Sequence, residues 1–191
     1  MKKLKLTIAM SLFAALVSGN LSAQDTASDS HTITISVPKV ALVDIEPSAS
    51  KNLILGFTAP TEAGNPIVAS PANNSLWLNY SSIKSGSDTR TITVKLGPPL
   101  QGVDVHVTAA GPTGAGAGTL GASAGLLTLS GVDQTIISGI GSAYTGNGAN
   151  NGHNLTYAVV AGSGPGGVAN YADLQITASA QTTVTYTISD N

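Results

Sequence analysis

The sequence predicts an all-β protein, a single antiparallel β-sandwich with glycine-rich loops. In several runs of the 191-residue chain, apolar residues alternate with Thr, Ser and other polar residues, which is the period of a strand with one buried face. Clusters of Gly, Pro and Asn separate these runs at intervals that suit a sandwich or a barrel. After residue 23 we find no convincing apolar period of a helix. We expect the arrangement to be roughly immunoglobulin-like.

The N-terminus has the pattern of a secretory signal peptide. Three lysines among the first five residues precede the mostly apolar run 6–17, and small residues follow before Gln24. The apolar run is too short to span a membrane comfortably. We therefore expect a signal peptide over residues 1–23, a polar segment over 24–30 and a β-sandwich domain over 31–191. The mature chain is expected to be secreted and to carry no transmembrane segment.

Alternation predicts the strands in chain order. Antiparallel sheets that pack on one face give this pattern, and β-branched residues fit their pleated surface. A further strand-like run covers residues 126–129. The residues expected on the inward faces of the other strands are Ile33, Ile35 and Val37; Leu76, Leu78 and Tyr80; Ile92, Val94 and Leu96; Val103, Val105 and Val107; Leu155, Tyr157 and Val159; Leu174 and Ile176; and Val184, Tyr186 and Ile188.

The strand over residues 75–81 places the only tryptophan, Trp77, opposite the apolar residues of the same strand. Trp77 could therefore stack on a sugar or anchor a protein contact, because Trp is enriched among interface hot spots. A second buried face or a loop folded over the ring would explain it as well, and this interpretation is favoured. Tyr80 and Tyr144 are the other candidates for surface contact.

Three connections are rich in glycine: residues 109–125, 139–152 and 161–169. The first is expected to be a loop or a weakly packed strand. It contains the letters of a G-x-S-x-G nucleophile elbow around Ser123, with Asp133 and His153 later in the chain. An elbow requires a sharp strand-to-helix turn, whereas the run after Ser123 is strand-like, so a chance match is favoured.

Charge and composition limit the classes of partner that the protein can bind. Three of the eight Lys and Arg residues lie in residues 1–23, so five remain against ten Asp and Glu residues, a net charge of about −5. No basic stripe is present, and we therefore expect neither nucleic acid nor an anionic membrane surface as a partner. The chain has no cysteine, so its stability is expected to come from the core.

Residues that could carry chemistry are sparse. His31, His106 and His153 lie far apart and have no spacing typical of zinc sites. His106 falls on the polar face of its strand and is expected at the surface. Asp44 and Glu46 share a face of a strand-like run, where a solvated role is the default. We expect no enzyme activity, no cofactor and no metal.

The last seven residues, 185–191, with the sequence TYTISDN, resemble the final strand of WxL-type bacterial cell-wall-binding domains. Tyr186 and Ile188 stand where that family has Trp and Leu. The family would imply peptidoglycan binding. More broadly, the composition and residue pattern of the chain resemble those of small secreted β-sandwich proteins of Gram-negative bacteria, including pilin-like and spore-coat-U-like surface subunits. This resemblance implies a periplasmic or cell-surface location.

The sequence thus favours a secreted structural or adhesive protein of a bacterial surface that associates with itself or with a protein partner through strand edges. Two segments could act as the exchanged strand, residues 24–37 and residues 182–189. The alternative is a carbohydrate or cell-wall binding module that uses Trp77, Tyr80 or Tyr144. An enzyme built around Ser123 or a carboxylate comes third.

Overall fold

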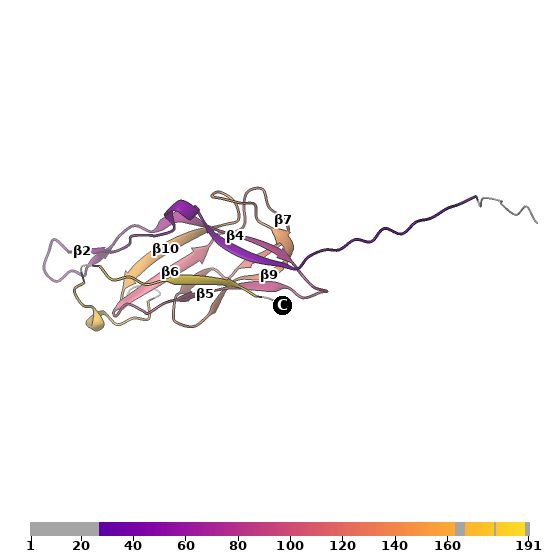
Figure 1. Cartoon of the computed structure of the whole chain (residues 1–191). Helices are drawn as coiled ribbons and strands as arrows, with labels where there is room; N and C mark the ends of the chain where they lie inside the picture. Colours follow the sequence, from indigo (N-terminus) through magenta and orange to yellow (C-terminus); the bar gives the residue numbers. More distant parts are fainter. Residues whose placement is uncertain (1–26, 163–166, 178, 190–191) are drawn as a thin grey trace, which may run out of the picture. The chain divides into compact units, whose positions relative to one another are not determined.

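The computed structural model describes residues 27–162, 167–177 and 179–189. The chain divides into two units between Ser36 and Val37, and every described strand belongs to the second unit. The elements are β1 (Val40–Glu46), η1 (Ser48–Ser50), β2 (Phe57–Thr58), β3 (Val68–Ala69), β4 (Asn73–Ile83), β5 (Arg90–Leu96), β6 (Val103–Ala109), β7 (Ala117–Ser123), β8 (Leu126–Thr128), β9 (Gln134–Tyr144), β10 (His153–Ala161), η2 (Tyr171–Asp173) and β11 (Val184–Ile188), where η denotes a 3-10 helix (Figure 1).

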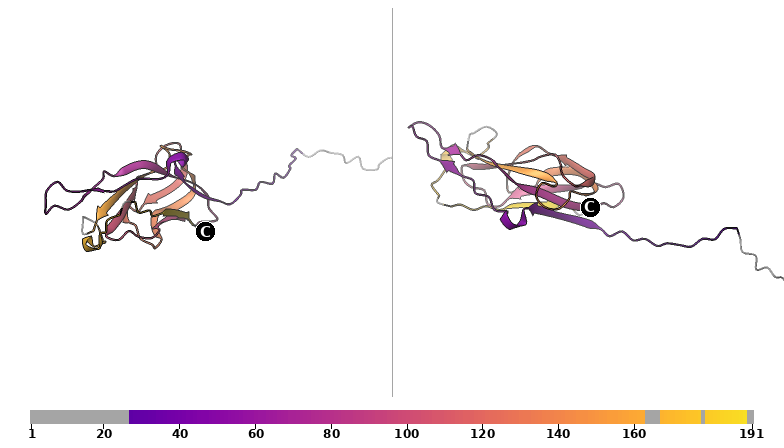
Figure 2. Two further views of the ribbon diagram at one scale, coloured as in Figure 1. Left: turned by 60° about the vertical axis from the view of Figure 1, so that its left-hand side comes forward. Right: turned by 90° about the horizontal axis from the view of Figure 1, so that it is seen from above.

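All strand pairs in the described residues are antiparallel, and the prediction of an all-β sandwich is confirmed. One half of the sandwich has the order β1-β4-β10-β6-β8, and the other has the order β11-β5-β9-β7. The long strands β4 and β9 join the halves, because Ser81 and Ser82 of β4 pair with Tyr144 and Ala143 of β9. Figure 2 shows the strands from two further directions. The separate pair β2–β3 forms a small second sheet.

The core lies between the two halves. Leu78 of β4, Val107 of β6 and Leu155 of β10 are fully buried on one side, and Ile92 of β5 and Ile137 of β9 are fully buried on the other. All five belong to one apolar cluster. Alternate residues of β5 are buried from Arg90 to Leu96, as the alternation predicts.

Two of the expected strands are wrong. Residues 32–37 form no strand, and Ile33, Ile35 and Val37 are 71%, 80% and 71% exposed. The run with Leu174 and Ile176 forms no strand either, and Ile176 is fully exposed. Alternation gives a segment an apolar face, but a strand also needs a neighbour with free backbone groups.

The glycine-rich segments differ from one another. Residues 117–123 form β7, whose residues are exposed or half-buried, in agreement with a weakly packed strand. The expected connection 139–152 is wrong in its first part, because residues 139–144 belong to β9. A methyl group on Gly118 of β7 would overlap the carbonyl oxygen of Ser142, so glycine lets the two strands approach closely. Ala161 is the last residue of β10, and residues 162 and 167–169 belong to the connection that follows it.

The helical segments in the described part of the chain are too short to cross a membrane.

Candidate functional site

The three aromatic candidates lie in different environments. Tyr144, at the end of β9, is 53% exposed, and Trp77 on β4 is half-buried. Tyr80 is only 3% exposed, so the structure places its ring in the core and away from a surface ligand. Tyr80 and Tyr144 both line a shallow groove of about 480 Å³, although Tyr80 exposes very little of its surface there, and Trp77 does not line this groove. The candidates therefore do not form one aromatic platform.

Tyr80 belongs to a buried polar network with His153. The Tyr80 hydroxyl donates to the carbonyl oxygen of Leu120 and lies 3.0 Å from Nε2 of His153. Nδ1 of His153 lies 2.7 Å from the carbonyl oxygen of Ala110, which can only accept, so this nitrogen carries a proton. The two rings stack with centroids 5.7 Å apart. His153 is fully buried, and the network links β4, β7 and β10.

Burial governs the protonation of both groups. Desolvation lowers the pKa of His153, although hydrogen bonds to the carbonyls of Ala110 and Leu120 raise it in part. Burial also raises the pKa of Tyr80, which keeps its hydroxyl protonated as a donor. Desolvation thus favours the neutral imidazole in the folded protein.

We expect His153 to make the fold sensitive to mild acid. An unfolded histidine has a pKa near 6.5, whereas that of folded His153 is lower. Below about pH 6.5 the unfolded chain takes up a proton that the folded chain does not. The free energy of unfolding therefore decreases as the pH is lowered, by at most about 1.4 kcal/mol per pH unit. Denaturant midpoints at about pH 7.5, 6.0 and 5.0, which lie on both sides of the pKa of an unfolded histidine, measure this slope. His153→Gln should flatten it, with exposed His31→Gln as the control. An unchanged slope in His153→Gln would contradict the assignment.

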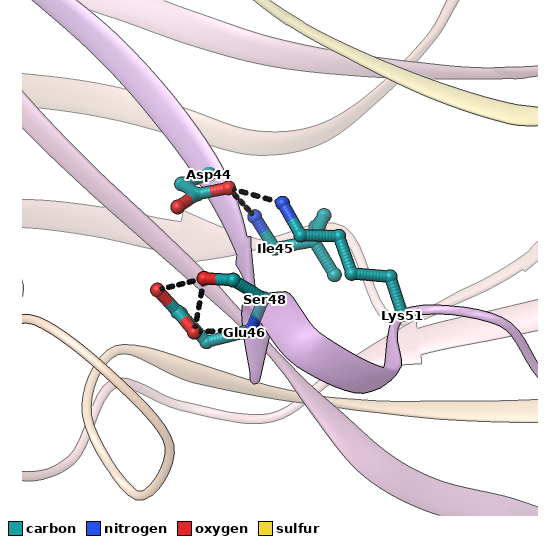
Figure 3. A network of polar contacts seen from close by, with 5 residues as sticks. All are labelled: Asp44, Ile45, Glu46, Ser48 and Lys51. Atoms are coloured by element: carbon teal, nitrogen blue, oxygen red, sulfur yellow. Dashed lines mark hydrogen bonds and ion pairs between the residues drawn. The ribbon is translucent and has the colours of Figure 1, made fainter.

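The carboxylates Asp44 and Glu46 have local partners. Lys51 Nζ donates to Asp44 Oδ1 at 2.7 Å, and Ser48 donates to Glu46 through its backbone N–H and its hydroxyl. Figure 3 draws these contacts. The hydrogen bond from Lys51 lowers the pKa of Asp44, against a smaller opposing effect of burial. These contacts organise the turn from β1 into η1.

The asparagines near His153 also serve the local structure. The Asn151 side chain donates to the carbonyl of Asn147 and accepts from the N–H of Ala115. The Asn154 side chain donates to the carbonyls of Asn74 and Leu76. Side chains that satisfy neighbouring backbone groups explain this asparagine-rich turn without a ligand.

The other chemical candidates remain separate. The Ser123 hydroxyl donates to the carbonyl of Ala109, and β8 follows Ser123 directly, so this stretch does not form the strand-to-helix turn of a nucleophile elbow. The expected surface position of His106 is wrong, since His106 is 5% exposed. Its neighbour on the same face, Asp104, is buried because its carboxylate accepts the N–H groups of Val168 and Ala169. In the described residues, no group of His, Asp and Glu side chains could hold a metal ion.

A larger groove of about 580 Å³ opens between two stretches of chain, and we call it the acceptor groove; apolar residues line it together with the polar residues Lys51, Asn52, Gln181, Thr182 and Thr183. Its core-side residues, Leu76, Val105, Tyr157 and Val159, belong to the apolar core. One rim carries Leu53 and Leu55, and the other consists of residues 180–184 together with Tyr186, while Ile45 of β1 also lines it.

The rim of the acceptor groove is incompletely covered. Leu53, Leu55, Val184 and Tyr186 pack against the core but stay half-buried. The hydroxyls of Tyr157 and Tyr186 lie 2.5 Å apart, which links β10 to β11. Desolvation raises the pKa of Tyr157 to about 12, so both hydroxyls stay protonated at neutral pH. Sequence analysis missed Leu53 and Leu55, because the run of Leu53, Ile54 and Leu55 is apolar throughout and shows no alternation.

Comparisons with protein-family models, with curated proteins and with solved structures find no match for this chain.

Proposed function

We propose that this protein is an exported structural subunit of a bacterial surface whose copies join by adding a strand to an open sheet edge. The observation that carries the proposal is the exposed apolar face of residues 32–37. Ile33, Ile35 and Val37 are each more than two-thirds exposed and alternate with polar residues. Three regularly spaced apolar side chains in an extended segment suit docking onto another chain.

The sandwich offers edges that could receive such a strand. Among the described residues, β1, β7, β8 and β11 each pair with a single neighbour, so one edge of each strand has no strand partner. Open edges are templates for pairing with another chain. The secretory pattern of residues 1–23, which lie outside the described residues, supports an exported location in the periplasm or on the cell surface.

The other functions have less support. Binding of a carbohydrate or cell wall would use exposed aromatic rings, but of the two tyrosines that line the smaller groove only Tyr144 is exposed, and Trp77 does not line that groove. The candidates for catalysis, Ser123 and the carboxylates Asp44 and Glu46, make local hydrogen bonds. A structural role without catalysis is therefore the proposal that the geometry supports best.

Light scattering after size-exclusion chromatography tests the proposal. We expect a chain of residues 24–191 to form dimers or longer assemblies as its concentration rises, because strand addition is a bimolecular step. A chain of residues 37–191 keeps all described strands but lacks Ile33 and Ile35, and it should stay monomeric. A monomer at every concentration for residues 24–191 would contradict self-assembly.

A further inference from the structure

The chain has two Asn-Gly pairs, Asn147-Gly148 and Asn151-Gly152, and both lie in the turn between β9 and β10. In such a pair the backbone nitrogen of glycine, once it has lost its proton, can attack the side-chain amide of asparagine and close a succinimide ring. Glycine favours this step, because it has no side chain to block the approach and its backbone is permissive. The two pairs have the same chemistry, so the surrounding structure determines which of them reacts.

The second pair is held by hydrogen bonds on both of its residues. Oδ1 of Asn151 accepts from the N–H of Ala115, and Nδ2 of Asn151 donates to the carbonyl of Asn147. The N–H of Gly152, a buried residue, donates to the carbonyl of Thr113 at 2.9 Å. These bonds must break before the side chain can turn and before the glycine nitrogen can attack, so they slow ring closure at Asn151.

The first pair is open. Asn147 is exposed, and its side chain makes no hydrogen bond among the described residues. The N–H of Gly148 likewise has no acceptor in the part of the chain that the structure describes. A methyl group on Gly148 would meet no atom within 4 Å, so the space around this nitrogen is free. The bond from Asn151 holds the carbonyl of Asn147, whereas the side chain of Asn147 can rotate toward Gly148.

We infer that Asn147 is a site of spontaneous deamidation in the folded protein, and that the fold protects Asn151. The Gly148 nitrogen gives its proton to hydroxide and bonds to Cγ of Asn147, while the Cγ–Nδ2 bond breaks and Nδ2 takes a proton from water to leave as ammonia. Water then opens the succinimide at one of its two carbonyls and gives aspartate or isoaspartate, and no electron is transferred. Since Asn147 lines the groove of about 480 Å³ together with Asp44 and Tyr144, the product adds a negative charge to this groove.

Peptide mapping tests this assignment. A chain of residues 24–191 is incubated in mildly alkaline buffer, once folded and once in denaturant, and samples are taken over time. No Lys or Arg follows Lys95, so chymotrypsin, which cleaves after Tyr144, is used to release both pairs on one peptide. Tandem mass spectrometry locates the exchange of an amide for a carboxylate, and electron-transfer fragmentation separates isoaspartate from aspartate. The chain in denaturant is the matched control, because it contains both pairs without the fold.

In the folded chain we expect Asn147 to deamidate about tenfold or more faster than Asn151, because several hydrogen bonds must first break at Asn151. In denaturant these bonds are absent, and the two asparagines should react at similar rates. Equal rates in the folded chain would overturn the inference, as would an Asn147 that reacts only in denaturant. The same preference for Asn147 in denaturant would also overturn it, because the local sequence and not the fold would then select the site.

Discussion

Ile35→Asp is expected to keep the protein monomeric at concentrations where the unmodified chain assembles. Ile35 is 80% exposed and is the middle residue of the apolar face, so its change should not disturb the fold. Burial of an isoleucine contributes roughly 1.5–3 kcal/mol, and a buried unpaired carboxylate adds a further cost. Since about 1.4 kcal/mol corresponds to tenfold in affinity, association should weaken roughly 100-fold or more. Sedimentation equilibrium measures the shift.

The matched control is Thr34→Asp, which adds the same charge one residue earlier on the outward face. Its side chain would stay in solvent, so its effect on association should be small, within about threefold. Equal losses in both variants would point to a general effect of negative charge, and unchanged assembly in Ile35→Asp would remove the apolar face from the mechanism. Denaturant unfolding of both variants checks that the sandwich stays intact.

Alternation predicted those strands whose partners lie inside the sandwich. The expected runs in β4, β5, β6, β10 and β11 occur in the structure, with their inward residues in or packed against the core. Residues 32–37 have the same alternation but no strand partner in the described chain. The pattern reports only an amphipathic segment, and pairing depends on residues far away in the sequence. For that reason sequence alone could not separate a strand of the fold from a segment free to dock elsewhere.

The glycines of residues 139–144 led to the wrong prediction of a connection, where the structure has the end of β9. Gly139 and Gly141 suggested a connection, yet both lie in a long strand paired with β7. A methyl group on Gly141 would lie 2.9 Å from Cβ of Thr119, so the small residue reflects a close approach of two strands. Local propensity carries no information about such a contact, which forms only in the folded sheet.

The candidate site was only partly predictable. The choice of residues 24–37 as one exchanged strand came from the sequence and remains a prediction. The acceptor groove was not foreseen, since its residues come from the stretch around Leu53 and from β4, β6, β10 and β11. Tyr80 was a candidate for surface contact, but it is buried and its hydroxyl donates to the carbonyl of Leu120 inside the fold. Contacts across such sequence distances follow from the sheet order, which alternation does not specify.

Gly152→Ala is expected to destabilise the fold by at least about 3 kcal/mol, since two separate costs combine at this position. Gly152 has φ +75°, where a side chain is strained. A methyl group there would also overlap the carbonyl oxygen of Leu78 and lie 3.2 Å from Cβ of Thr145. Leu78 is fully buried in the middle of β4, so its backbone cannot move without disturbing the core. Gly152 is further fixed by two backbone hydrogen bonds with Thr113.

Gly148→Ala separates the two costs. Gly148 has a similar φ of +88°, but a methyl group there would meet no atom within 4 Å. This variant should lose only about 1 kcal/mol, from backbone strain alone. Denaturant unfolding of both variants gives the difference between them, which measures the contact of Gly152 with β4. Equal losses would mean that the backbone beside Leu78 yields easily, and that the close approach of Gly152 to β4 adds nothing to the strain.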